Sequence, residues 1–273
     1  MSINRRKAML VLLVLAVSFL LCILIAGVLN TDAAMKTDFT RKNQPPSLRY
    51  PFGTDWMGRD MFARTIAGLS MSIRIGLLTA TISALIAFAL GSAAAVMGKT
   101  VDIFIGWLID LVMGIPHILL LMLISFACGK GFRGIVIGIL CTHWMSLARV
   151  IRGEVLQLKQ SGYVQVAAKL GTGRLRIVTR HMLPHLVPQF MVGLILLFPH
   201  AILHEASITF LGFGLSPEQP AIGVILSESI RYLLTGSWLL AVFPGISLSL
   251  IVILFDYIGG MARKLLDPAS AHE

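Results

Sequence analysis

The chain has 273 residues, a mean hydropathy of +0.85 and a formal net charge of +10 at pH 7. Hydrophobic residues make up 56% of the chain and charged residues 13%, which is about half the charged fraction of soluble domains. This composition excludes an ordinary soluble protein and predicts an all-α membrane protein, because several apolar runs reach the ~20 residues that cross a bilayer. We assign the basic excess to cytoplasmic loops and expect no nucleic-acid partner.

The first predicted unit, residues 1–29, is a short basic flank followed by a membrane span. Arg5, Arg6 and Lys7 precede an apolar run that extends from residue 8 to residue 29. This run is longer than the roughly 7–15 apolar residues of a signal peptide, so we expect an uncleaved span with a cytoplasmic N-terminus. The alternative is that this run is a signal peptide and is cleaved near Ala33-Ala34.

Residues 30–70 form the second predicted unit, a polar segment on the outer side. It contains the sequence P-F-G-T-D-W-M-G-R-D at 51–60. In the residues that follow, apolar side chains share one helix face, whereas Asp60, Arg64 and Ala67 lie opposite. The pattern predicts a helix on the membrane surface, and we interpret it as a brace in preference to a ligand contact.

The third predicted unit, residues 71–262, is a core of five further spans that includes a basic cytoplasmic loop at 153–185. The spans are expected at residues 73–97, 103–127, 134–150, 186–210 and 238–260. A cytoplasmic tail, 263–273, follows. Outside the long 30–70 segment, Lys and Arg are concentrated in the proposed inner segments, which predicts that both termini are cytoplasmic.

The sequence Gly98-Lys99-Thr100 resembles the end of a phosphate-binding P-loop but does not meet its requirements. Such a loop needs a glycine five residues before Gly98, where this chain has Ala93, and it needs a preceding strand in place of a membrane helix. We therefore predict a cytoplasmic turn at Lys99 and no nucleotide site in this chain.

Polar residues inside the spans are candidates for a translocation path, because ionisable groups in a membrane are costly unless they face protein or water. The candidates are Asp110, expected to point into the bundle, together with His143, His200, His204 and Glu205. His200 and His204 are four residues apart and share a helix face, so they are also a candidate metal pair. The alternative is that each histidine is hydrogen-bonded to a neighbouring carbonyl group.

A metalloenzyme is the rival class that these histidines suggest. The metalloprotease pattern H-E-x-x-H would begin at His204 but meets Ile208, and the inverse pattern H-x-x-E-H from His200 meets Leu203. The three cysteines, Cys22, Cys128 and Cys141, form no C-x-x-C pair. We therefore predict no catalytic residue and no bound cofactor.

The basic loop contains a short predicted helix between Gly162 and Gly171, the latter a natural residue for a helix C-terminus. A helix of two turns is unstable alone in water, so it must pack on its own bundle or on another protein. Tyr163, Val166, Ala167 and Leu170 share one face, and Ala167 with Ala168 would allow close approach of a neighbour.

This loop resembles the cytoplasmic coupling loop of binding-protein-dependent ABC importer permeases, in which E-A-A, three residues and G precede a downstream L-P. Gln165 takes the position of the Glu and Val166 that of the first Ala, whereas Ala167, Gly171 and Pro184 match. The resemblance implies that residues Tyr163 to Pro184 fit a cleft of a separate ATPase subunit. The change at Gln165 removes a charge from that contact.

Further segments resemble the dipeptide, oligopeptide and nickel branch of these permeases. They are 51–60, Asp110 with Pro116, A-R-V-I-R-G at 148–153, E-A-S-I-T-F-L-G-F-G at 205–214 and L-D-P at 266–268. The resemblance implies a type I ABC importer permease with six spans, the C-type subunit, in a bacterial inner membrane. Its partners would be a second permease, two ATPases that use ATP and Mg, and an extracytoplasmic binding protein.

The histidines favour nickel or a nickel chelate as the substrate within this branch. Dipeptides or oligopeptides are the alternative substrates. A passive channel is disfavoured, because a channel does not need a coupling loop.

Overall fold

A computed structural model describes residues 5–173, 176–233 and 236–266 of the chain. Regular structure in these residues is helical, apart from one isolated antiparallel bridge between Thr54 and Asp60. Arg174 of the basic loop and the last two residues of the L-D-P motif lie outside the described residues. The helices are α1 (Arg5–Leu29), α2 (Thr31–Met35), η1 (Phe39–Arg41), α3 (Met61–Val96), α4 (Lys99–Met113), α5 (His117–Ala127), α6 (Gly131–Thr142), α7 (Trp144–Lys159), α8 (Gly162–Lys169), η2 (Ile177–Met182), α10 (Leu183–Phe210), α11 (Ile222–Ile230) and α12 (Leu239–Leu266).

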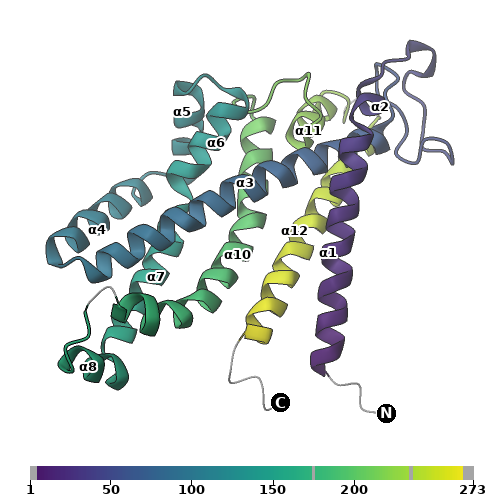
Figure 1. Cartoon of the computed structure of the whole chain (residues 1–273). Helices are drawn as coiled ribbons and strands as arrows, with labels where there is room; N and C mark the ends of the chain where they lie inside the picture. The colour runs from purple at the N-terminus through teal and green to yellow at the C-terminus, as the bar shows by residue number, and fades with distance from the viewer. Residues whose placement is uncertain (1–4, 174–175, 234–235, 267–273) are drawn as a thin grey trace.

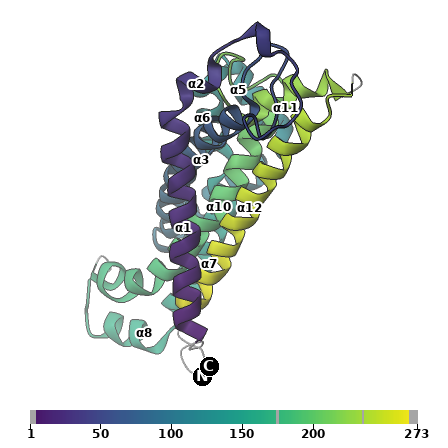
Figure 2. The same ribbon diagram turned by 90° about the vertical axis from the view of Figure 1, so that its right-hand side faces the viewer.

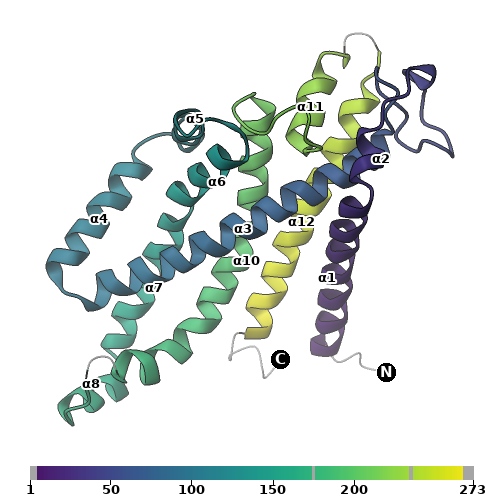
Figure 3. The same ribbon diagram turned by 45° about the horizontal axis from the view of Figure 1, so that its top comes forward.

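The predicted all-α membrane architecture is confirmed. Five helical segments of the described chain are long and apolar enough to cross a membrane. The helices α4 and α5 form a sixth span if they are counted together, although they are bent by 93°. Figure 3 shows this bend, because α5 is seen almost end-on while α4 runs across the view.

The ends of the helices divide the molecule into two poles. The start of α1, the end of α12 and the short helix α8 lie at one pole, whereas α2, α5 and α11 lie at the other (Figures 1 and 2). The turn at Gly98 joins two helices, α3 and α4, so no strand precedes the G-K-T sequence. This arrangement lacks the strand that a P-loop requires.

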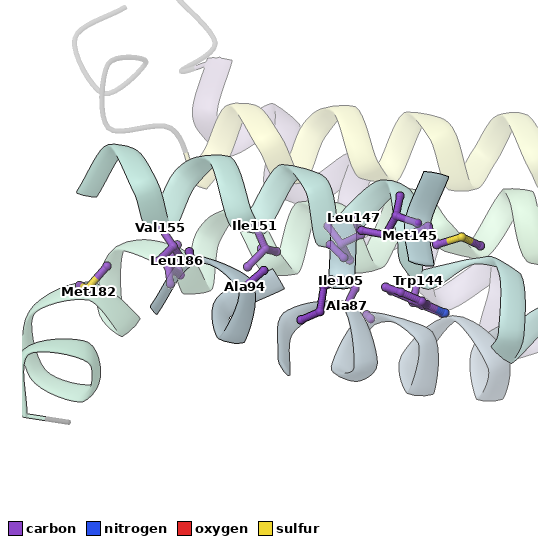
Figure 4. Packing of buried hydrophobic residues seen from close by; sticks show 14 of the residues in the cluster. Ala87, Ala94, Ile105, Trp144, Met145, Leu147, Ile151, Val155, Met182 and Leu186 are labelled. Atoms are coloured by element: carbon purple, nitrogen blue, oxygen red, sulfur yellow. The ribbon is translucent and has the colours of Figure 1, made fainter. Parts of the chain in front are cut away.

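The long helix α3 lies diagonally across the bundle and packs against α1, α4, α6, α7, α10, α11 and α12 (Figure 1). Its small residues allow close approach: a Cβ atom added to Gly91 would lie 2.5 Å from the carbonyl oxygen of Ala148 in α7. Leu147 and Ile151 of α7 pack in the same cluster as Ala87 and Ala94 of α3 (Figure 4).

The first ten residues of α3 correct the expectation of a separate surface helix. Residues 61–96 form one continuous helix of 36 residues, about 54 Å long at 1.5 Å per residue. Arg64 and Ala67, placed on the outward face from the sequence, are buried. The reason is that no proline interrupts this stretch and that α2, α11 and the outer segment cover it.

A cluster of four charged residues, three of them buried, explains the P-F-G-T-D-W-M-G-R-D sequence. Asp55 accepts hydrogen bonds from Arg59 Nε at 2.6 Å and from Arg64 Nη1 at 2.9 Å. Glu228 of α11 accepts from Arg64 Nη2 at 2.9 Å and from Arg59 Nη2 at 3.1 Å. Each carboxylate therefore has two guanidinium partners, which satisfies charges that would be costly if buried alone.

The tight turn before α3 depends on Gly58. Its φ angle is +73°, and a Cβ atom there would lie 1.8 Å from the carbonyl oxygen of Asp38. Asp60 then caps α3, because its side chain accepts hydrogen bonds from the backbone N–H groups of Phe62 and Ala63. The segment thus connects α3 and α11 at the pole that contains α2.

We predict that Arg64→Met destabilises the protein by about 3–5 kcal/mol, because Asp55 and Glu228 each lose a buried partner. The measurement is the thermal unfolding temperature of the purified protein in detergent. Arg133→Met, at an exposed position in α6, is the matched control and should have little effect. Equal unfolding temperatures for the two variants would contradict this account.

Candidate functional site

A large cavity lies where two membrane spans are interrupted. It has a volume of about 700 Å³ and opens between the α4–α5 junction, the α6–α7 junction and the middle of α10. The lining residues are Val112, Met113, Gly114, Ile115, Pro116, His117, Thr142, His143, Met145, Ser146, Leu197, His200 and His204. A volume of this size is typical of small-ligand sites.

The interruptions have local causes in the sequence. Pro116 lacks a backbone N–H group and disfavours helical geometry in the residue before it, so α4 ends at Met113 and α5 begins at His117. A second break separates α6 from α7 at His143. Irregular backbone at membrane depth is tolerated only where it is covered by protein or lines a cavity.

Three histidines from three different segments meet at this cavity. His117 Nδ1 lies 3.0 Å from His204 Nε2. The ring of His143 lies 5.0 Å from that of His117 and 4.9 Å from that of His204, measured between centroids. We call these three residues the histidine cluster.

The structure differs from the sequence interpretation in the membership of this cluster. His143 and His204 were predicted site residues, whereas His117 was not. Its position directly after Pro116 was the available signal, because a proline break exposes the first residue of the next helix to a cavity.

The structure does not pair the side chains of His200 and His204 as a metal site. His204 Nδ1 is hydrogen-bonded to the backbone carbonyl oxygen of His200 at 2.7 Å. Within residues 5–173, 176–233 and 236–266, no group of three or more His, Cys, Asp or Glu side chains could hold a metal ion. Of the two alternatives for His204, the structure shows the carbonyl contact.

Neither predicted acidic residue lines the cavity. The side chain of Asp110 is 72% exposed and pairs with Arg149 of α7, so it does not point into the bundle as expected. Glu205 is fully buried and accepts a hydrogen bond from Thr209 Oγ1 at 2.9 Å. Because neighbouring helix positions point about 100° apart, Glu205 faces away from the cavity that His204 lines.

The helix expected in the basic loop is present as α8. Its end forms a complete Schellman motif: Gly171 N–H donates to Ala168 C=O and Thr172 N–H donates to Ala167 C=O, both at 3.1 Å. The motif requires a left-handed residue, and Gly171 has a φ angle of +81°. Pro184 lies in the first turn of α10, after the π-helical segment η2.

The helix α8 has one face on the bundle and one face open. Val164 is buried, and Ala167 packs beside it against the cluster that contains Met182. The adjacent side presents Tyr163, Val166 and Leu170, of which Leu170 is 81% exposed. We call these three residues the open face of α8.

The predicted residues Gln165 and Ala168 lie on the side of α8 away from the open face. Both are exposed, and both line a second cavity of about 430 Å³ between α8 and the turn at Gly98. The side-chain amide of Gln165 donates to the backbone carbonyl of Gln160 at 3.1 Å. The helix α7 begins beside the first cavity at Trp144 and ends just before α8, so it connects the two regions.

Comparison with known proteins identifies relatives of this fold and sequence. Residues 84–270 match the family model described as the binding-protein-dependent transport system inner membrane component. The chain is 31% identical over 265 residues to a dipeptide transport system permease protein of Bacillus subtilis, covering 97% of this chain and 82% of that protein. It is 33% identical over 264 residues to a putative peptide transport system permease protein of Brucella suis, covering 97% and 88%.

A solved structure shares the fold. The chain is similar to a chain of the MetNI methionine ABC transporter in an inward-facing conformation, with a TM-score of 0.61 and 16% sequence identity. The match covers 76% of this chain and 98% of the other.

We predict that Gly171→Val loosens α8, because a β-branched residue is strongly disfavoured at positive φ. Hydrogen exchange monitored by mass spectrometry should show faster exchange of the amide groups of residues 166–172. Gly173→Val is the matched control, since Gly173 has no positive φ angle and an added Cβ would meet nothing within 4 Å. Unchanged exchange in Gly171→Val would contradict the role of the Schellman motif.

Proposed function

The chain belongs to the family of binding-protein-dependent transport system inner membrane components, the permease subunits of ABC importers, and we propose that it imports dipeptides or oligopeptides. The proposal is carried by the cavity at the helix breaks, in a chain that matches named dipeptide and peptide permeases over 97% of its length. These names favour the peptide alternative over nickel, which the histidines suggested from sequence. The relatives are transport subunits, consistent with a component that is not itself an enzyme.

Translocation would use the first cavity together with a second permease subunit. The cavity is lined mainly by apolar groups, with imidazoles and the hydroxyl groups of Thr142 and Ser146 as its polar side chains. Such a lining suits a varied group of peptides, because few contacts depend on particular substrate side chains. An extracytoplasmic binding protein would deliver the substrate at the pole that contains α2, α5 and α11.

The open face of α8 is the proposed contact with an ATPase subunit. Exposed apolar side chains on a short helix are unfavourable in water and are typical of a helix that inserts into a groove. Gln165 offers that partner a polar but uncharged group. The basic residues flanking α8 support a cytoplasmic location for this pole, where the partner ATPases would use ATP and Mg.

Coupling would pass from α8 through α7 and α10 to the cavity. Binding of ATP by the partner would favour one of two arrangements of the bundle, because a ligand shifts an equilibrium by its differential affinity for the states. Three features of this path are able to bend: η2, Pro188 and Pro199. The last of these lies one residue before His200, which lines the cavity.

The substrate class is tested by uptake into proteoliposomes that contain the complete importer. We expect ATP-dependent uptake of labelled dipeptides and no uptake of labelled nickel in the absence of a chelator. Stimulation of ATP hydrolysis by the loaded binding protein provides a second readout. Uptake of nickel alone would overturn the peptide assignment.

We predict that Val166→Asp reduces dipeptide uptake by at least about tenfold, because an unpaired charge buried in the ATPase contact costs more than the 1.4 kcal/mol that a factor of ten represents. Stimulated ATP hydrolysis should fall with it. Leu48→Asp is the control, since Leu48 is an exposed apolar residue of the outer segment.

Replacement of Gly171 by a bulky residue should uncouple ATP hydrolysis from uptake. Normal uptake by both the Val166 and Gly171 variants would contradict docking through α8.

A further inference from the structure

The hydrogen bonds of the histidine cluster determine which ring nitrogens carry protons. His204 Nδ1 lies 2.7 Å from the carbonyl oxygen of His200, which can only accept a hydrogen bond. His204 Nδ1 must therefore carry the proton. In the neutral ring, His204 Nε2 is then an acceptor.

The proton position on His117 follows from this contact. His117 Nδ1 lies 3.0 Å from His204 Nε2, so His117 Nδ1 must be the donor. The other nitrogen of the neutral ring, His117 Nε2, has no proton and presents a lone pair. The three groups form a chain of hydrogen bonds that runs from His117 through His204 to the backbone of His200.

His143 also carries its proton on Nδ1, but a different hydrogen bond determines this. The hydroxyl group of Thr142 donates its only proton to the carbonyl oxygen of Gly138 at 2.9 Å. Thr142 Oγ1 is therefore an acceptor for His143 Nδ1, which lies 3.2 Å away. His143 Nε2 is left without a proton. It is buried and has no hydrogen-bond partner in the part of the chain that the structure describes.

The hydrogen bonds of the histidine cluster leave two acceptor nitrogens, which favours a ligand that carries N–H or O–H donors. The cavity lining contains no Asp, Glu, Lys or Arg residue, so no charged side chain competes with these nitrogens for such a ligand. A carboxylate would bring its lone pairs against those of the two Nε2 atoms. Each helix break brings together one helix C-terminus and one N-terminus, whose partial charges largely offset each other.

We propose that His117 Nε2 and His143 Nε2 bind the protonated amino terminus of the peptide substrate in the cavity. This inference rests on the proposed function. An ammonium group has three N–H donors and can supply both imidazole acceptors at once. Neutral acceptors suit a transport site, because the substrate must bind well enough to enter and weakly enough to leave.

A metal ion is less suitable for this site than an ammonium group. Two imidazoles leave a tetrahedral or octahedral coordination sphere incomplete. The described lining offers no carboxylate or thiolate to complete it. The experiment must therefore distinguish binding of nickel from binding of an ammonium group.

The experiment measures access to the cavity in the assembled importer. Ser146 lines the cavity and is exposed, so Ser146→Cys places a thiol there. The variant is made after Cys22, Cys128 and Cys141 are replaced by serine. The rate of alkylation by a small neutral maleimide is then measured with dialanine and with N-acetyl-dialanine.

We expect dialanine to slow alkylation by about tenfold at a concentration about nine times its Kd, because the rate falls with the fraction of cavities that the peptide occupies. N-acetyl-dialanine should give no protection, because acetylation removes the charge and two of the three N–H donors. His143→Leu should abolish protection by dialanine, whereas His143→Gln, which keeps an acceptor oxygen, should retain it. Arg133→Leu, at an exposed position of α6 outside the cavity lining, is the control and should behave as the parent.

Equal protection by the two peptides, or full protection in His143→Leu, would overturn the proposal. An unchanged alkylation rate without peptide shows that each variant retains an open cavity. The metal outcome is tested by isothermal titration of nickel chloride alone into the cysteine-free importer. If nickel binds, and if this binding is lost in His143→Leu, the histidines bind a metal cation and the amine assignment is overturned. Failure of dipeptide uptake by the parent importer would refute the proposed function, whereas normal uptake with unselective protection would refute only this inference.

Discussion

The close approach of other helices to α3 is the constraint on which the rest of this structure depends. Lipid is as apolar as a leucine side chain, so helices in a membrane associate through close packing and not through removal of apolar surface from water. Gly91 meets the backbone of Ala148, and Gly76 would place a Cβ atom 2.6 Å from the side chain of Ile202. These two contacts set the positions of α7 and α10. Both helices contribute residues to the cavity, so the small residues of α3 determine the geometry of a site that α3 does not line.

The cavity exists because two spans depart from regular helical structure at the same place. Each break leaves backbone groups without partners inside their own helix, and lipid cannot satisfy them. Placing both breaks against α10 lets protein cover them and leaves the enclosed space for a ligand. His117 and His143 lie at these breaks, where side chains turn towards the space and not towards a neighbouring helix turn.

The pole that contains α8 differs from the cavity region, because it presents exposed apolar side chains. The helix α8 is too short to be stable alone, and its contacts through Val164 and the Schellman motif hold it in place without covering Tyr163, Val166 and Leu170. A stable attachment on one side and an open apolar face on the other are the features on which the proposed ATPase contact depends. The sixteen residues of α7 then span about 24 Å between this helix and the cavity.

Much of the architecture could be predicted from the sequence, because it depends on local properties. Long apolar runs located the spans, the distribution of basic residues grouped the two termini with the basic loop, and the spacing of Gly162 and Gly171 located α8. The contacts between distant segments could not be predicted in this way. Hydrophobic periodicity placed Arg64 outward, whereas its partner Glu228 lies 164 residues away and draws it into a buried cluster. Likewise, helical spacing paired His200 with His204, but the ring of His204 turns to a backbone carbonyl and to His117 on another span. Sequence alone therefore determined which segments are long and apolar enough to span a membrane and where the short helix of the basic loop lies. Only the tertiary structure decided which polar side chains meet, because that depends on the packing of helices whose separation in sequence carries no information about their distance in space.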